Sequence, residues 1–316
     1  MNVSVVIPTT LRQELLDALR SVETQRLGRE RIEIIVVVDG PESAMDGPMA
    51  DALSGVEKII FTGGGAGAPA ARNLGVQHST GVWIAFLDDD DYWLPSKLSE
   101  QVAAASSLAR TNSKIVIACR VQQTQSSSEA LSVPVPSRCL AQGDDVARYL
   151  FERRRPSLGR SSIFTSTLLV DAELARSVPW DESLKRHQDW DWLIKAQAAG
   201  AGLHQLTEVL SIQRVGSSGS ISASNDWRSS LRWAESWKDK WSPNTYVDFI
   251  AGQPLRYALQ ARSLAGVRSC IREVYNARKL PSVGPAIIAG AGILSRRHLE
   301  RLLVPQSRTR QAGNAE

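Results

Sequence analysis

The chain has 316 residues, of which 43% are hydrophobic and 22% charged, and these proportions exclude a disordered tail or a collagen-like repeat. The formal net charge of +4 is compatible with a polyanionic substrate but too small to indicate nucleic-acid binding. The three cysteines are odd in number and lack a metal-ligand spacing, which favours a reduced, cytosolic location. There is no run of 18 apolar residues to predict a membrane span, and the N-terminus lacks the basic start of a signal peptide.

Strand and helix patterns alternate through the first hundred residues. Apolar, β-branched runs predict buried strands at 3–7, 32–38, 56–61 and 82–87. Helical spacing predicts helices at 11–25, 49–53 and 69–78. Repeated units of this kind imply right-handed crossovers and a parallel sheet, in which ligands bind beyond the carboxyl ends of the strands. Asp39 and the run 88–91 follow two such ends, so the pattern predicts acidic groups at one crevice.

The pattern changes along the rest of the chain. Residues 164–170 predict a strand and residues 183–199 a helix, and from about residue 226 helical spacing dominates to about residue 303. We therefore expect a first domain over 1–225, a helical region over 226–305 and a disordered tail over 306–316.

Four carboxylates, Asp88 to Asp91, come directly after the predicted strand at 82–87. Clustered like charges are costly unless something neutralises them. Mg²⁺ or Mn²⁺ would do so, because these ions commonly take one or two carboxylates together with substrate phosphates. The alternative is a solvated acidic turn or a helix N-cap, which does not explain why four acids gather at the end of a strand.

Residues 3–9, 33–40, 70–73 and 86–101 together resemble family-2 glycosyltransferases. The most specific piece is the segment FLDDDDYWLPSKL at 86–98. The resemblance implies an α/β fold of the GT-A type, which is a Rossmann-like, mostly parallel sheet flanked by helices that binds nucleotide-diphospho-sugars. It covers roughly residues 1–225, so the remaining helices form a C-terminal extension.

The resemblance also implies roles for the acids at the strand ends. The metal-ligating carboxylate of the family falls on Asp90, with Asp88 beside it, and Asp88 and Asp89 would contact the ribose and metal-bound water. Asp39 matches the residue that hydrogen-bonds the nucleotide base, although Val38 stands where the family often has a second acid. Further donor-binding candidates in the resembling segments are Pro8, Thr9, Arg72 and Arg214.

The segment HQDWDW at 187–192 supplies a second acidic site. On a helix, positions 189 and 191 point to different faces, so only one of them can face the crevice. Family members commonly carry Glu-Asp in place of Gln188-Asp189, and the resemblance assigns the catalytic base to Asp189. Such a base takes the proton of a weakly nucleophilic hydroxyl, and a single base implies direct displacement with inversion. A helix N-terminal charge is the alternative for Asp189, and His187 is a second titratable candidate.

Two arginines have competing interpretations. Arg72 would pair with the diphosphate of the donor, or form a salt bridge to the aspartate run. Arg214 lies in a segment, 213–222, that resembles the family segment after the base but lacks its usual His. It would steady the diphosphate, or it is a surface arginine on a flexible loop.

Two other enzyme classes fit parts of the sequence. Residues 63–68, GGGAGA, approximate a dinucleotide fingerprint with Asp88 about twenty residues further on, as in an oxidoreductase that binds a nicotinamide or flavin cofactor. The loop follows the third predicted strand, whereas the fingerprint normally follows the first. A nucleotidyltransferase would need a basic, glycine-rich loop near the N-terminus, which residues 9–12 match weakly. We therefore expect an inverting glycosyltransferase of cell-surface polysaccharide or glycolipid synthesis, using a nucleotide-sugar donor and a saccharide or lipid-linked acceptor.

The C-terminal region carries an aromatic stripe and a basic stretch. Trp233, Trp237 and Trp241 recur every four residues, which favours one buried helix face over an acceptor or membrane-facing surface. Residues 256–310 hold eleven Lys or Arg residues against two acids, and 281–294 is apolar and glycine-rich. This composition predicts peripheral association with the inner face of the cell membrane, with homodimerisation through the same patch as the rival.

Overall fold

The computed structural model describes residues 2–27, 31–45, 47–109, 114–125, 128–153, 161–216 and 225–292. Contacts divide these residues into two compact units. The second unit comprises 131–133, 151–153 and 225–292, and the first comprises the other described residues. The domain boundary near residue 225 stays a prediction, and the tail predicted at 306–316 lies outside the described residues.

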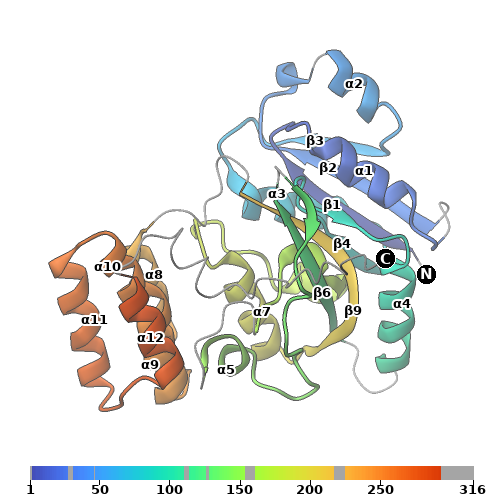
Figure 1. Ribbon diagram of the computed structural model, residues 1–316. Helices are drawn as coiled ribbons and strands as arrows, with labels where there is room; N and C mark the ends of the chain where they lie inside the picture. Colours follow the sequence, from blue (N-terminus) through green and yellow to red (C-terminus); the bar gives the residue numbers. More distant parts are fainter. Residues whose placement is uncertain are drawn as a thin grey trace, which may run out of the picture. The chain divides into compact units, whose positions relative to one another are not determined.

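The first unit is built on a mixed, nine-stranded sheet across the described residues, in the order β3-β2-β1-β4-β8-β6-β9-β5 with β7 beside β6 (Figure 1). The strands are β1 Val3–Thr9, β2 Ile32–Val38, β3 Lys58–Phe61, β4 Trp83–Phe86, β5 Tyr92–Trp93, β6 Ile115–Gln125, β7 Ser128–Leu131, β8 Leu169–Asp171 and β9 Gly202–Val215. The first four strands pair in parallel, as the alternating pattern predicts. The sheet becomes mixed because β8 runs antiparallel to both β4 and β6.

Seven α-helices accompany this sheet among the described residues. They are α1 Leu15–Glu23, α2 Gly47–Leu53, α3 Gly67–His78, α4 Lys97–Leu108, α5 Val146–Phe151, α6 Ala172–Ser177 and α7 Gln188–Ala198. The strand predicted at 164–170 is wrong over its first half, because Thr165–Thr167 form a 3-10 turn and the strand β8 begins only at Leu169. The helix predicted at 183–199 starts later, at Gln188.

Both faces of the parallel strands are covered, which explains their largely apolar sequences. All seven residues of β1 are buried. Alternate residues of β1 and β2 share one cluster with the apolar stripe of α1 and with α4. On the opposite face Ile35 and Val37 meet Ala71 of α3. This sandwich fixes the carboxyl ends of β1, β2 and β4 relative to the start of α3.

Helix α3 approaches β1 so closely that a glycine is required at position 75. A Cβ atom built on Gly75 would lie 2.4 Å from Cγ1 of the buried Val6. We expect Gly75→Ala to lower the free energy of unfolding by about 1–3 kcal/mol, because an added methyl group overpacks a filled core. Urea unfolding followed by circular dichroism measures this loss.

The matched control is Gly55→Ala, since a Cβ at Gly55 meets no heavy atom within 4 Å. It should change stability by no more than about 0.5 kcal/mol. Equal stability of the two variants would show that α3 does not depend on this close approach.

The second unit is mainly helical over its described residues. These are α8 Trp227–Ser236, α9 Pro243–Ile250, α10 Arg256–Gln260, α11 Leu264–Asn276 and α12 Val283–Ala291, with a π-helical turn at Ala251–Leu255. Trp233, Trp237 and Trp241 are buried, which confirms that the aromatic stripe is core. They do not share one helix face, however, because α8 ends at Ser236. The Trp233 and Trp241 rings meet edge-on at 5.4 Å between centroids.

Candidate active site

The four aspartates after β4 have different surroundings, and Asp88 is the first of them. Its side chain is 32% exposed and accepts a hydrogen bond from Nη2 of Arg72 at 2.6 Å. Its backbone amide donates to Oγ of Ser166, which lies in the 3-10 turn before β8. Asp88 is thus held in place by its backbone while its carboxylate faces Arg72 of α3.

Asp89 lies beneath the run. It accepts a hydrogen bond from Oγ1 of Thr9 at 2.6 Å and an ion pair from the Arg12 guanidinium, and its side chain is only 4% exposed. Arg12 also reaches Oδ2 of Asp90 at 3.3 Å. Burial alone would lower the pKa of Arg12, but these two carboxylates raise it, so the guanidinium stays charged. The ribose contact expected for Asp89 stays a prediction, and its carboxylate points to protein groups here.

Asp91, the last residue of the run, is buried and contacts two other segments of the chain. Its carboxylate accepts hydrogen bonds from Oγ of Ser166 at 2.6 Å and from the backbone amide of Arg214 at 3.1 Å. Burial, together with the negative charges of Asp88 and Asp90, raises the pKa of Asp91 well above its ordinary value. Asp91 therefore joins the acidic turn to β9 rather than offering a free carboxylate to a ligand.

Arg72 connects the aspartate run to α7. The side chain is 6% exposed and lies over the Trp180 ring, 4.8 Å from its centroid. One nitrogen, Nη2, binds Asp88, and Nη1 donates to Oε1 of Gln188 at 3.3 Å. The salt bridge to the run that the sequence offered as an alternative is therefore present. Among the described residues Nε of Arg72 has no hydrogen-bond partner, although it is buried.

Asp189 stands at the second position of α7, next to this arginine. Its Oδ1 atom accepts a hydrogen bond from the Trp190 amide at 2.9 Å. Burial raises the pKa of Asp189 to about 6, against the Trp190 hydrogen bond and the charge of Arg72, while the charge of Asp88 adds to the rise. Such a carboxylate is ionised at neutral pH and still basic enough to accept a proton.

The residue before α7 has an unusual backbone conformation. His187, the residue before the helix, has a φ of 63°, a left-handed conformation that is uncommon outside glycine. Its ring stacks on Trp190, 4.8 Å between centroids and 11° between planes. The strained backbone of His187 thus lies beside Asp189, and the stacking on Trp190 stabilises it. Strained residues of this kind are common at functional sites.

Asp191 is directed elsewhere on α7. It is buried and forms an ion pair with Nζ of Lys195 at 2.7 Å. Lys195 also pairs with Asp181 at 3.2 Å. Asp191 is therefore a buried charge paired within α7. Asp189, by contrast, lies near Arg72 and Asp88.

Asp39, which follows β2, forms hydrogen bonds with the glycine-rich loop at 63–68. Its carboxylate accepts hydrogen bonds from Oγ1 of Thr62 at 2.6 Å, from the Gly67 amide at 2.8 Å and from the Ala66 amide at 2.9 Å. Although burial alone would raise it, these donors hold the pKa of Asp39 below its ordinary value. The loop's amides are thus already engaged, which removes the feature that suggested a dinucleotide pyrophosphate site. The nucleotide-base contact of Asp39 stays a prediction.

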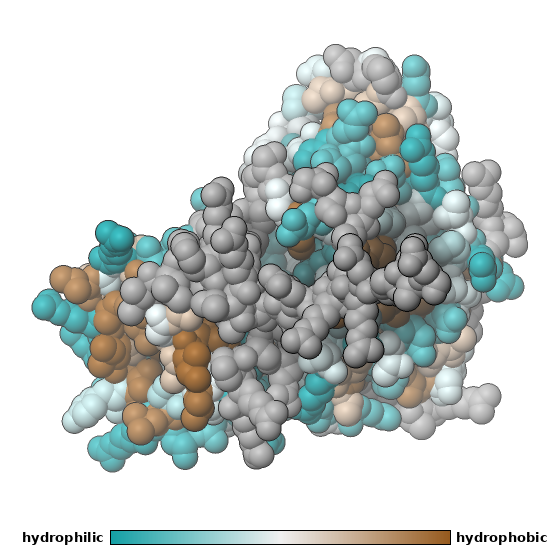
Figure 2. All heavy atoms as spheres, viewed as in Figure 1, coloured by the Kyte–Doolittle hydropathy of each residue, from teal (hydrophilic) through white to brown (hydrophobic). Residues whose placement is uncertain are grey.

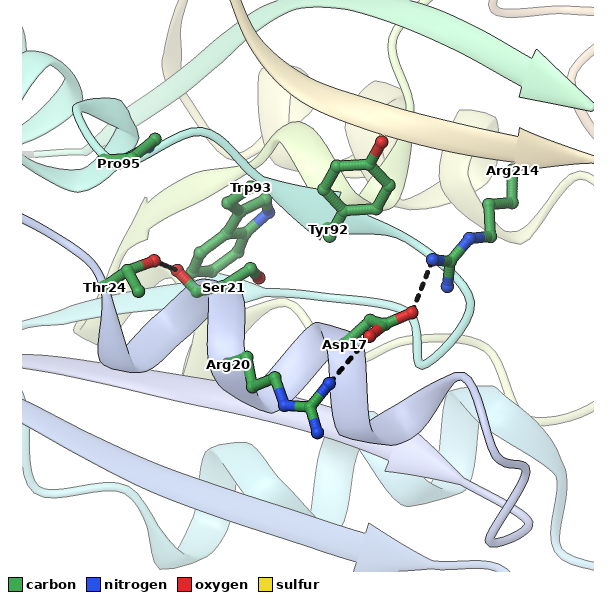
Figure 3. Close-up of a pocket in the computed structure, with 8 residues that line it drawn as sticks. All are labelled: Asp17, Arg20, Ser21, Thr24, Tyr92, Trp93, Pro95 and Arg214. Atoms are coloured by element: carbon green, nitrogen blue, oxygen red, sulfur yellow. Dashed lines mark hydrogen bonds and ion pairs between the residues drawn. The ribbon is translucent and has the colours of Figure 1, made fainter. Parts of the chain in front are cut away.

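Arg214, near the end of β9, turns its guanidinium toward α1, as Figure 3 shows. Its Nη2 atom pairs with Asp17 at 2.6 Å, and the guanidinium lies 5.2 Å from the centroid of the Tyr92 ring. These residues line an open pocket of about 400 Å³ with Arg20 and Trp93. Arg214 reaches the aspartate run through its backbone amide, and residues 217–222 of its segment lie outside the described residues.

The acidic turn can be tested for its fit to a divalent cation. In the part of the chain that the structure describes, no three His, Cys, Asp or Glu side chains stand together as a metal site. Mg²⁺ and Mn²⁺ need fewer, because substrate phosphates and water complete their coordination. Asp88 and Asp90 are the partly exposed acids of the run, at 32% and 20%, so they fit such a two-carboxylate donor set.

Several residues of this site were missed by sequence reasoning. In the sequence Arg12 belongs only to the weak phosphate-loop pattern at 9–12. In the structure its guanidinium forms ion pairs with Asp89 and Asp90. Ser166 gave no signal, because its partners Asp88 and Asp91 are more than 70 residues away in the chain.

Comparison with known proteins gives consistent matches. Residues 4–136 match the family model described as glycosyl transferase family 2. The chain is 25% identical over 287 residues to the amylovoran biosynthesis glycosyltransferase AmsB of Erwinia amylovora, covering 88% of this chain and 92% of that protein. It is 34% identical over 107 residues to the putative teichuronic acid biosynthesis glycosyltransferase TuaG of Bacillus subtilis, covering 32% of this chain and 40% of TuaG.

Solved structures match at the level of the fold. The crystal structure of S. aureus TarS 1–349 in complex with UDP-GlcNAc superposes with a TM-score of 0.53 and 13% sequence identity, over 97% of this chain and 77% of that one. The mixed sheet with its flanking helices is thus of the GT-A type, as expected from the sequence, and it is followed by a helical C-terminal region.

Proposed function

Residues 4–136 match glycosyl transferase family 2, and from that premise we propose that the chain is a glycosyltransferase that transfers a sugar from a nucleotide-diphosphate-sugar to an acceptor hydroxyl with inversion. The observation that carries the proposal is the connection of Asp88, Arg72 and Gln188 beside Asp189. It joins the acidic turn, where a diphosphate would lie, to a carboxylate whose pKa of about 6 suits a general base.

The proposed roles follow from this arrangement. Asp189 accepts the proton of the acceptor hydroxyl as the new bond forms, and the attack from the opposite side of the sugar ring inverts the anomeric carbon. Arg72 orients the diphosphate while it holds Asp88 and Gln188 in place. The proposed donor-binding set is Pro8, Thr9, Asp39, Arg72, Asp88, Asp89 and Arg214.

A divalent cation is part of the proposal. We assign Mn²⁺ or Mg²⁺ to Asp90 and Asp88, where it would stabilise the departing diphosphate as a Lewis acid. Arg12 pairs with the buried Asp89 and lies 3.3 Å from Oδ2 of Asp90, so Asp90 is the acid that would exchange an arginine contact for the cation.

The proposed setting is the synthesis of a cell-surface polysaccharide or glycolipid, with a saccharide or lipid-linked acceptor. It is supported by the names of AmsB and TuaG, which place those relatives in amylovoran and teichuronic acid biosynthesis. We propose a cytoplasmic location, consistent with the free cysteines Cys119, Cys139 and Cys270.

A panel of nucleotide-sugars in a thermal-shift assay, with and without Mn²⁺, tests donor and metal together. One donor class should raise the melting temperature only when Mn²⁺ is present, by the equivalent of about 2.7 kcal/mol at 100 times its Kd. Asp90→Ala should abolish the metal-dependent part of this shift.

The matched control is Asp51→Ala, which removes an exposed acid of α2. This variant should keep the full shift. A donor that binds equally in the presence of a chelator would contradict the metal site, and a panel in which no nucleotide-sugar raises the melting temperature would contradict the donor.

A further inference from the structure

Large apolar side chains gather at the surface of the second unit, on α11, on α12 and on the turn between them. Figure 2 shows hydrophobic patches over this part of the surface, interspersed with hydrophilic residues. The residues are Leu264, Ile271, Tyr275, Leu280, Val283 and Ile287, with exposed fractions of 48–84%. We call this set the α11–α12 face.

The α11–α12 face is the outer side of helices whose inner side is already packed. Leu264, Ile271 and Tyr275 are spaced by seven and four residues, so they lie on one stripe of α11. The opposite side of α11 carries Gly266, where a Cβ would lie 2.7 Å from the Trp227 ring, and the fully buried Cys270. Helix α11 therefore has two apolar sides, and the core of the unit accounts for only one of them.

Positive charge surrounds the α11–α12 face. Arg268 and Arg272 are exposed, and each lies one helical turn from a residue of the apolar stripe. Arg278 and Lys279 are exposed between the helices. The acid of this stretch, Glu273, is engaged by Nζ of Lys238 at 2.7 Å and by the Tyr246 hydroxyl at 2.8 Å. The rim of the face is thus cationic.

We propose that the α11–α12 face binds the surface of an anionic lipid membrane, with its apolar side chains in the headgroup region and its arginines on lipid phosphates. Apolar residues beside exposed cations are the combination that such an interface attracts. None of the described helices combines the length and apolarity needed to cross a bilayer.

Charge also distinguishes the lipid from a second copy of the chain. A two-fold dimer through this face would bring the same patch of both copies together. Arg268 and Arg272 would then meet a rim of the same sign, which opposes association. Anionic headgroups meet both the apolar stripe and the charged rim.

Co-sedimentation with vesicles, without donor or acceptor, tests this surface independently of sugar transfer. The full chain should bind vesicles of phosphatidylcholine with 40% phosphatidylglycerol, and bind pure phosphatidylcholine far more weakly. Arg268→Gln with Arg272→Gln should weaken the binding by about 30-fold, roughly fivefold for each lost cation. High salt should weaken it as well, since the screening length falls from about 10 Å at 0.1 M to about 3 Å at 1 M.

A matched pair of glutamate variants tests the apolar part. Ile271→Glu lies in the face at 56% exposure, whereas Val82→Glu lies in the first unit at 53% exposure. The first should lose about tenfold or more in vesicle affinity and the second little, with unchanged melting temperatures. Equal loss in both variants, or vesicle binding unaffected by either, would overturn the proposal. A dimer in sedimentation velocity that Ile271→Glu dissociates, without vesicle binding by the unaltered chain, would also overturn it.

Discussion

Replacing Asp189 with asparagine is expected to lower the turnover number by roughly 10²–10⁴-fold, because the acceptor hydroxyl then loses its general base. Asparagine has the same shape, and its side-chain oxygen can still accept the hydrogen bond from the Trp190 amide. The fold and the donor affinity should therefore be preserved. Initial rates with saturating donor and acceptor, together with the thermal shift given by the donor, measure the two effects separately.

The pH dependence of the unaltered enzyme gives a second test of the same residue. The base must be deprotonated, so kcat/KM should rise with pH and level off above the pKa of Asp189, which burial raises to about 6. Below that pH the rate should fall about tenfold per unit. In Asp189→Asn this acid limb should disappear from the residual activity.

Asp191→Asn is the matched control, since Asp191 lies two residues away and pairs with Lys195. It should lower stability, because a buried ion pair loses one charge, while the acid limb near pH 6 remains. An Asp189→Asn variant with full activity, or an acid limb that vanishes in His187→Gln instead, would refute the assignment of the base to Asp189.

Arg72→Lys is expected to reduce kcat/KM by about 10²-fold, although the positive charge is kept. A lysine has one nitrogen at its end, so it cannot contact Asp88 and Gln188 together and still lie flat over Trp180. The loss would come from the geometry of the diphosphate site. Steady-state kinetics with varied donor concentration measure it.

Arg72→Gln separates charge from geometry, because the charge of Arg72 lowers the pKa of Asp189. In this variant the acid limb should move to a pH above 6, whereas in Arg72→Lys it should stay near 6. Arg20→Lys changes an arginine whose side chain is 73% exposed and should alter neither quantity. Kinetics of Arg72→Lys that match those of the unaltered chain would mean that Arg72 does not orient the donor.

The parallel half of the sheet could be predicted from the sequence because β1, β2 and β4 are covered on both faces and are largely apolar. Strands β6 and β9 could not. The second half of β6 mixes buried with partly exposed residues, and the two strands pair across about ninety residues of chain. The 3-10 turn at Thr165–Thr167 has β-favouring residues, and tertiary contacts override that preference.

The candidate site was predictable to a similar extent. Asp88 and Arg72 could be placed near each other from the sequence, because Asp88 follows a predicted strand and Arg72 lies in the predicted helix before that strand. The partners that the sequence did not indicate all come from distant segments. Arg12 meets Asp89 across 77 residues, and Arg214 meets Asp17 across 197. Such contacts depend on how the sheet is wound, which no local pattern records.

The hydroxyl of Ser166 has a consequence for donor affinity. It accepts the amide of Asp88 and donates to the carboxylate of Asp91, so both ends of the acidic turn are tied to the segment before β8. The turn is therefore preorganised, and an incoming sugar nucleotide does not spend binding energy on immobilising it. The strength of donor binding then reflects the contacts that the ligand makes rather than the entropy of arranging its receptor.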